Sequence, residues 1–421
     1  MIINKKNLFS LIEFIYLLIP ISLVFSIAIA DFFLSLIVIF FIIHTLRDKI
    51  FFYYKNKIFI FFIIFCIYLV FVSFIKYQEV PLSVIFFFRF GIFSIATCYL
   101  LDRNKILLKY ILISIFTTCT FVALDAIIQF IFGINILGYE YNLNSQPRLS
   151  GLFGDELILG SYLSRFAPLV FLQLGIIYSQ LKNSKLSLIV LMMFLFLYTF
   201  VILASGERLS LVYFMISITI FLYLLNSKKI FFLTIILIVS SFLIISSDRE
   251  SRLFKTTYLQ IQGTFNKTQD GSYKLKDFEK IPVAHIHHWK SATLMLKNNF
   301  IFGVGPTKFR EKCKEPNYSV PNGCANHPHN IYFQLLSEAG ILGFLFVIVL
   351  FVLLTLKLAS KINKNKSFDL KNNYVVYNLS LLCVFLHFFP FLPNGNFFNN
   401  WLNIITFIPI GIYFHTSYNI R

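Results

Sequence analysis

Long apolar runs alternate with short polar connections along most of the chain. The runs extend for about 20 residues, the length of an α-helix that crosses a bilayer. They lack the short alternation that is typical of a transmembrane β-barrel. The pattern predicts about twelve membrane-spanning helices, at residues 8–27, 28–46, 56–75, 81–101, 106–133, 158–181, 186–204, 208–226, 229–247, 329–357, 372–391 and 399–417.

The composition agrees with this interpretation. Of the 421 residues, 58% are hydrophobic and only 13% are charged, which is too apolar for a soluble domain. We therefore expect an all-α polytopic integral membrane protein. The net charge of +18 would suit a nucleic-acid partner. The basic residues follow the membrane topology instead, so we expect no nucleic acid.

Basic residues distinguish the two sides of the membrane. Cytoplasmic loops carry an excess of Lys and Arg, and every second predicted connection is basic. The short connections between them hold little more than Lys76, Arg148 and Arg208. With an even number of spans, both termini are then cytoplasmic. Cleavage of a signal peptide after Ala30 is the alternative, but a second apolar run follows at once, so we expect the first span to be retained.

One connection is much longer than the others. Residues 248–328 separate the ninth and tenth predicted spans, and the count of spans places them outside, on the non-cytoplasmic side. We therefore divide the chain into helices 1–9 (residues 1–247), a periplasmic loop (248–328) and helices 10–12 (329–421). A loop of this length usually has a function, and a solvated cap is the alternative.

Two of the six cysteines, Cys313 and Cys324, lie in this loop. We expect them to form a disulfide, because the compartment outside the inner membrane is oxidising. The bond would fix the segment just before His327. Two free thiols are the alternative. The other cysteines lie in predicted spans and are interpreted as small apolar side chains.

The most varied side-chain chemistry lies in residues 324–343, which lead into the tenth span. Pro328 disfavours helix for the residue before it, so we expect the helix to begin at about His329, with His329 and Asn330 in its first turn. The N–H groups of a helix start attract phosphate. Their partial positive charge disfavours imidazolium, which keeps His329 available as a base.

Three further residues of this helix have predicted structural roles. Glu338 lies nine positions after His329, about half a turn out of phase with it. We expect a buried carboxyl that is hydrogen-bonded to another span, although an ionisable group inside a span is also a functional candidate. Gly340 and Gly343 are expected to allow close approach of a second helix.

Three arginines lie near the predicted periplasmic boundary on other segments. Arg148 precedes a glycine-containing segment, Arg165 lies near the end of its span, and Arg208 opens a span. A guanidinium can bind two phosphate oxygens at once, and an arginine at a helix end can also simply reach toward the headgroups. Because all three share the side of His329, we expect an anion site there.

The periplasmic loop adds His285, His287 and His288 to His327 and His329. Imidazoles are common zinc ligands, so a metal site is an alternative. The spacing matches no closed zinc motif and no carboxylate lies beside it, so we expect no metal. A Walker-type phosphate loop and a G-x-S-x-G element are also absent from the sequence, so we expect no cofactor.

These motifs resemble a known family. His329-Asn330, nine residues, then Gly340 and Gly343 is similar to the signature of the O-antigen ligase/O-antigen polymerase family of bacterial membrane glycosyltransferases. The resemblance covers roughly residues 145–355. Supporting similarities are Trp289-Lys290-Ser291-Ala292, Asn299-Phe300-Ile301-Phe302-Gly303-Val304-Gly305, the segment Arg148–Gly151 and Arg208.

The resemblance implies a GT-C-like fold and a reaction. A glycan on undecaprenyl diphosphate is transferred to an acceptor hydroxyl at the periplasmic face of the inner membrane. The acceptor is lipid A–core for a ligase and another lipid-linked repeat for a polymerase. The expected partners are this donor, the acceptor and membrane lipids. His329 is the implied general base, Arg148 and Arg208 are implied to hold the diphosphate, and the expected substrate contacts are Asn330, His285, His288, Arg165 and His327.

One position departs from the family pattern. Many members have an arginine about four residues before the tryptophan, where this chain has His285. The role of this arginine in the diphosphate site would then fall to His285 or His288, or to Arg249 or Arg252.

Two rival functions stay open. We favour a ligase over a polymerase because the single large loop precedes the His-Asn helix. A transporter or flippase of lipid-linked glycans is the alternative of another class. It would need ionisable residues deep within several spans, and Asp31, Arg89 and Asp125 are the few candidates.

Overall fold

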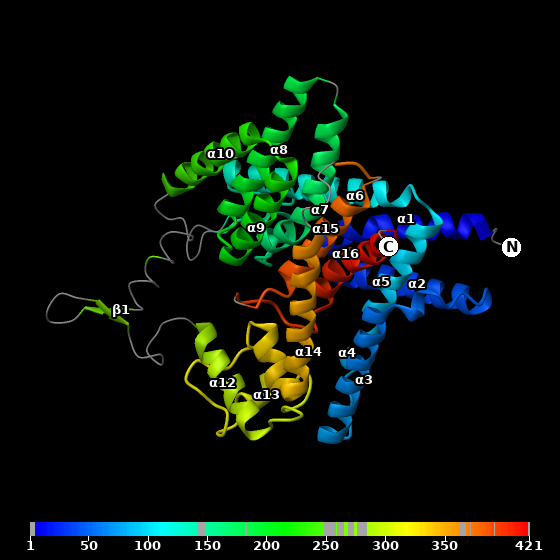
Figure 1. The fold of residues 1–421 in the computed structure, drawn as a ribbon. Helices are drawn as coiled ribbons and strands as arrows, with labels where there is room; N and C mark the ends of the chain where they lie inside the picture. Colours follow the sequence, from blue (N-terminus) through cyan, green and yellow to red (C-terminus); the bar gives the residue numbers. More distant parts are fainter. Residues whose placement is uncertain are drawn as a thin grey trace.

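The computed structural model describes residues 5–141, 148–181, 183–247, 258, 265–267, 273–275, 284–361, 368–370, 372–390 and 392–419. Within them the protein is an all-α membrane protein, as predicted (Figure 1). Its one described sheet is a small antiparallel pair, β1 (Phe265–Lys267) and β2 (Tyr273–Leu275).

The described residues contain 10 helical segments that are long and apolar enough to cross a membrane, and each coincides with a predicted span. They are α1 (Lys5–Phe25), α2 (Ile27–Arg47), α3 (Lys57–Tyr77), α4 with α5 (Leu82–Ile85 and Phe88–Arg103), α6 (Leu107–Phe132), α7 (Leu159–Gln180), α8 (Ser184–Ala204), α9 (Arg208–Leu225), α10 (Lys228–Ser247) and α14 (Ile331–Lys361).

The last two predicted spans correspond to α15 (Asn373–His387) and α16 (Asn400–Asn419). The first of them has only 15 residues, and the second is not among the helices that are both long and apolar enough to cross a membrane. Most of their side chains are buried, and α16 packs against both α5 and α15. These helices therefore lie inside the bundle, and a total of twelve spans stays a prediction.

Short polar residues fix where several helices begin. Ser26 separates α1 from α2, and its side chain accepts a hydrogen bond from the N–H of Ile29. Asn56 caps α3 in the same way, and Asn183 caps α8. Such side chains satisfy the unpaired N–H groups of a first helical turn, which is why single polar residues can divide a long apolar sequence into separate helices.

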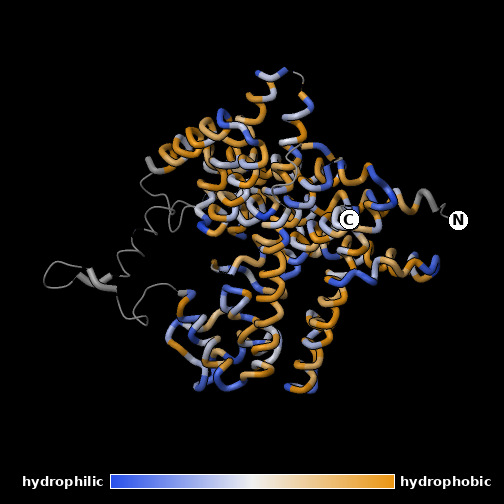
Figure 2. Tube along the Cα trace, in the orientation of Figure 1, coloured by the Kyte–Doolittle hydropathy of each residue, from blue (hydrophilic) through white to orange (hydrophobic). Residues whose placement is uncertain are grey.

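A polar cap lies at one end of the molecule. It contains α12 (Ala284–Asn298) and α13 (Phe309–Lys312) and packs beside the first half of α14 (Figure 1). Figure 2 shows that the cap is more hydrophilic than α3 and α14. Cys313 and Cys324 form a disulfide within it. The two described 3-10 helices are η1 (Tyr53–Lys55) and η2 (Gly151–Phe153).

The helix α14 is interrupted by a kink at Gly340, whose φ of +69° is not helical. The carbonyl oxygen of Ser337 instead accepts from the N–H of Val304 (2.8 Å). A Cβ at position 340 would lie 2.1 Å from the carbonyl oxygen of Ile301, so only glycine fits. The segment that packs closely against Gly340 is the part of the cap that contains Ile301 and Val304, rather than the second helix that we expected.

Candidate functional site

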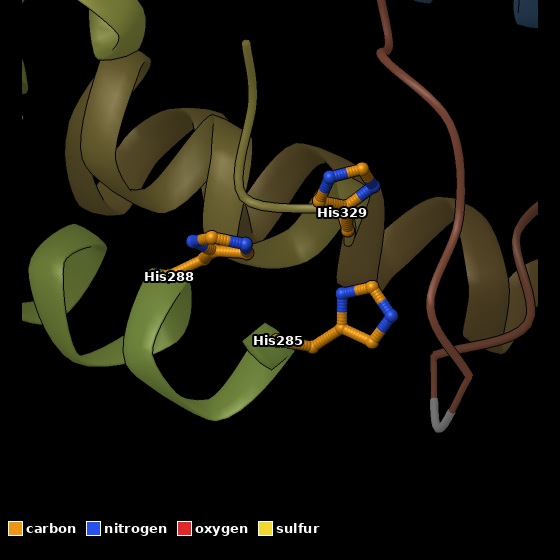
Figure 3. A group of neighbouring side chains, drawn as sticks. All are labelled: His285, His288 and His329. Atoms are coloured by element: carbon orange, nitrogen blue, oxygen red, sulfur yellow. The ribbon is translucent and has the colours of Figure 1, made fainter. Parts of the chain in front are cut away.

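Four histidines from two separate segments of the chain lie together in the cap. His285 and His288 are one turn apart on α12, and His327 and His329 lie in the segment before α14. The ring centroid of His329 is 4.9 Å from that of His285, 5.4 Å from that of His288 and 4.3 Å from that of His327. Figure 3 shows the rings of His285, His288 and His329 around a common space. We call these residues the histidine cluster.

Trp289 joins the two segments. Its indole N–H donates to the carbonyl oxygen of Pro328 (3.1 Å), and its ring stacks on Phe333 with the centroids 5.0 Å apart. The tryptophan of the predicted motif therefore positions the backbone that leads into His329.

His329 has an unusual backbone conformation, with φ +54°. Residues other than glycine seldom adopt this left-handed region, and the conformation persists only where neighbouring contacts impose it. One such contact is the N–H of Asn394, which donates to the carbonyl oxygen of His329 (2.6 Å).

Asn330 caps α14, which begins at Ile331, two residues later than we predicted. Its side-chain oxygen accepts from the N–H groups of Tyr332 (2.9 Å) and Phe333 (3.3 Å). Its side-chain N–H groups donate to the carbonyl oxygens of Pro390 and Leu392. All four hydrogen-bonding positions of the amide are used and the residue is 2% exposed, so Asn330 has a structural role, while its predicted contact with substrate stays a prediction.

Burial, rather than the start of a helix, controls the protonation of these histidines. Burial and the neighbouring imidazoles lower the pKa of His329 to about 3. Burial likewise lowers the pKa of His327 to about 4 and that of His285. These rings are therefore neutral near pH 7, with one nitrogen lone pair each.

Arg165 lies behind the cluster rather than in an open site. Its side chain is 4% exposed. One guanidinium nitrogen lies 3.2 Å from Nδ1 of His387, and another donates to Oδ1 of Asn394 (2.8 Å). Asn394 holds the backbone of His329, so Arg165 is connected to that backbone through one residue. Its predicted contact with substrate stays a prediction.

Arg148 and Arg208 lie on two other segments of the chain. Arg208 is exposed at the start of α9, and its charge lowers the pKa of His285 in addition to the larger effect of burial. Burial also lowers the pKa of Arg148, which the charges of Glu207 and Arg208 modify in opposite directions. The charge of Arg208 thus acts both on His285 of the histidine cluster and on Arg148.

Gln129 of α6 positions the segment of Arg148. Its side-chain oxygen accepts from the N–H groups of Ser150 (3.1 Å) and Gly151 (2.8 Å). The Nε atom of Arg148 is buried and has no hydrogen-bond partner among the described residues. A buried donor of this kind usually finds a partner, so it suits a bound anion.

Sequence reasoning missed Glu207, which precedes Arg208 in the chain and interacts electrostatically with Arg148. Its carboxylate accepts from the N–H of Gly160 (2.8 Å) and from Oγ of Ser210 (2.9 Å). Burial raises its pKa to about 7, against the effect of these hydrogen bonds and of Arg148. The available signal was a carboxylate adjacent in sequence to an arginine, at a connection between two spans.

Glu338 is buried, as expected, and is 1% exposed. Its carboxylate accepts from the N–H of Phe309 (3.0 Å) and from Nε2 of Gln334 (3.1 Å). The first of these partners belongs to the cap and not to another span, so Glu338 fastens the cap to α14. Arg249 and Arg252 lie outside the described residues.

Comparison with known proteins finds one family that matches part of the chain. Residues 186–348 match the family model described as O-antigen ligase. This segment contains Arg208, Glu207 and the whole histidine cluster, whereas Arg148 precedes it. A comparison with curated proteins gives no match. Over residues 186–348, the chain is therefore similar to the O-antigen ligase family.

Proposed function

We propose that the protein is a ligase that transfers a glycan from undecaprenyl diphosphate to a hydroxyl of lipid A–core. The observation that supports this proposal is a neutral His329 beside His285, which in turn lies within the electrostatic influence of Arg208. An acceptor hydroxyl needs a base, and a departing diphosphate needs fixed positive charge.

In this reaction Nδ1 or Nε2 of His329 takes the proton of the acceptor hydroxyl. The hydroxyl oxygen forms a bond to the anomeric carbon while the bond from that carbon to the diphosphate oxygen breaks. The electron pair stays on the diphosphate, where Arg148 and Arg208 stabilise the new charge. One direct displacement inverts the configuration at the anomeric carbon.

The low pKa of His329 has a consequence for this mechanism. An imidazole with a pKa of about 3 is a weak base in the free protein. A diphosphate bound beside it would favour the imidazolium and raise that pKa. The donor would thereby activate the base, and the acceptor would be deprotonated only when a glycan is ready for transfer.

We also propose that the cap and the cluster face the periplasm, with both termini in the cytoplasm. The alternation of basic connections supports this orientation. The disulfide between Cys313 and Cys324 supports it too, since disulfides persist in oxidising compartments.

A transport function has less support, because its candidate charges have internal partners. Arg89 forms an ion pair with Asp31 (2.9 Å). The carboxylate of Asp125 accepts from the N–H of Ile136 (3.1 Å) and from the side chain of Asn135 (3.2 Å). These groups therefore stabilise the fold.

The test is reconstitution of the purified full chain in vesicles with an undecaprenyl-diphosphate-linked glycan and lipid A–core. We expect glycan-linked core and free undecaprenyl diphosphate in equal amounts. Elongated lipid-linked glycan would instead identify a polymerase. Movement of the donor across the bilayer without a new glycosidic bond would overturn both enzyme assignments.

Two variants sharpen this experiment. His329→Ala is expected to abolish transfer at an unchanged amount of membrane protein. His287→Gln is the matched control, because residue 287 lies on α12 between two cluster residues but about 160–200° around the helix from His285.

A further inference from the structure

We propose that His285, His288 and His329 bind one transition-metal dication of the zinc class, and that the bound metal blocks transfer by occupying His329. Metal binding stands on the geometry alone. The block of transfer rests on the proposed function, in which the same imidazole is the base.

The three rings already have nearly the separation that a metal needs. One nitrogen from each lies within 4.8 Å of the other two. Zinc binds imidazole nitrogen at about 2.0–2.1 Å, which in a tetrahedral site separates two ligand nitrogens by about 3.4 Å. The three rings surround a common space (Figure 3), so we propose that side-chain rotations toward this space bring the nitrogens to that separation when the metal binds.

The backbone holds these ligands in place. His285 and His288 are three residues apart, so they share one face of α12. The backbone at His329 is fixed by Asn394, and the preceding Pro328 is fixed by Trp289 of the same helix α12. Hydrogen bonds therefore connect the segments that carry the three ligands.

A second, independent observation also points to a ligand. Nδ1 of His285 and Nδ1 of His288 are buried and have no hydrogen-bond partner among the described residues. Buried polar atoms without partners are rare in folded proteins. Nε2 of His327 is likewise buried and has no hydrogen-bond partner among the described residues, and the ring centroid of His327 lies 4.3 Å from that of His329. We therefore propose His327 as the fourth ligand.

The surrounding charges indicate a reversible ligand rather than a permanent one. The positive charge of Arg208 lies close enough to affect His285, and it repels a dication. The predicted metal ligands include no carboxylate or thiolate. Binding should therefore be weaker than at structural zinc sites, where such ligands neutralise the metal. A site of this kind suits inhibition when the metal is abundant.

The binding test uses the purified full chain in detergent, first treated with EDTA. Cobalt(II) is added, and the visible absorption of tetrahedral Co²⁺ is measured before and after addition of Zn²⁺. We expect one equivalent of Co²⁺ to bind and Zn²⁺ to displace it. His285→Gln and His288→Gln should each weaken binding by at least about 10-fold, whereas His287→Gln should bind like the unaltered protein.

Thermal unfolding of each variant establishes that it is folded. Absence of tetrahedral Co²⁺ absorption in the unaltered protein would overturn the site, and so would equal affinity in folded His285→Gln and His288→Gln. The metal-free protein is then assayed for transfer with and without Zn²⁺. We expect Zn²⁺ to stop transfer and EDTA to restore it.

The two proposals can fail separately. If the metal-free protein transfers glycan but does not bind Zn²⁺, the metal site is rejected and the proposed function stays intact. The protein could instead bind the metal but show no transfer activity even after the metal is removed. That result would reject the proposed function and the inhibition by metal, and would leave the metal site intact.

Discussion

The indole N–H of Trp289 donates to the carbonyl oxygen of Pro328, 39 residues later in the chain, across 3.1 Å. This bond holds the residue before His329, whose φ of +54° is strained. A conformation of this kind costs about 1–3 kcal/mol and needs support from its surroundings. The geometry of the proposed base therefore depends on α12 as much as on its own segment.

Replacing Trp289 by Phe tests this dependence. The change keeps an aromatic ring against Phe333 but removes the N–H. The bond contributes about 1 kcal/mol, so we expect glycan transfer to slow by about 5–10-fold. Trp401→Phe is the control, because Trp401 donates a similar bond to the carbonyl oxygen of Leu23 in the bundle. Equal loss of activity in the two variants would count against a positioning role.

Gly340→Ala should destabilise the protein strongly. Gly340 and Gly133 both have positive φ, but an added Cβ would meet nothing within 4 Å at Gly133 and the carbonyl oxygen of Ile301 at Gly340. We expect Gly133→Ala to cost about 1–2 kcal/mol and Gly340→Ala at least about 2 kcal/mol more. Thermal unfolding in detergent measures both changes. A similar fall in melting temperature would show that backbone conformation alone matters at position 340.

The pH profile of kcat/KM should be flat where an ordinary histidine titrates. Because the pKa of His329 is about 3, the neutral, active form predominates throughout pH 5–6.5. The unfolded chain, with a histidine pKa of about 6.5, binds more protons in this range. Stability should therefore decline as the pH falls below about 6.5 toward 3.

Initial rates with subsaturating donor test this profile. An inflection near pH 7 would belong to Glu207, whose pKa is about 7, and Glu207→Gln should remove it. Half-loss of kcat/KM near pH 6.5 in Glu207→Gln would contradict the low pKa of His329.

Two arginines should respond differently to replacement by Gln. Arg165 is buried, and its loss leaves Asn394 without a charged partner. We expect Arg165→Gln to cost about 2–3 kcal/mol of stability. Arg208 is exposed, so Arg208→Gln should change stability little while lowering kcat by about 10²–10³-fold. Melting temperature and transfer rate are measured on the same preparations, and a reversed pattern would refute these assignments.

The hydrophobic pattern predicted the spans because lipid leaves few choices. A backbone in a bilayer must satisfy its own hydrogen bonds, so each lipid-facing span is an apolar run of helical length. The pattern did not reveal that α15 and α16 are interior helices. A buried helix with polar side chains such as Asn403 and Thr406 differs little in sequence from a weak span.

The parts of the site differ in how far sequence could predict them. Residue types and the predicted membrane side led us to group His329 with Arg148 and Arg208, and this grouping stays a prediction, supported by the effect of Arg208 on His285. The structural places of Asn330 and Arg165 depend on partners in residues 387–394, which are distant in the chain. Pairings of this kind arise from tertiary packing, which the local pattern does not encode.

The most direct test of the central claim is the transfer rate of His329→Asn. Asparagine tolerates the left-handed backbone that His329 adopts, so this variant removes the base and keeps the local fold. We predict a fall in kcat of at least about 10²-fold, with unchanged melting temperature and donor binding. A rate within about 3-fold of the unaltered protein would mean that His329 is not the base that deprotonates the acceptor.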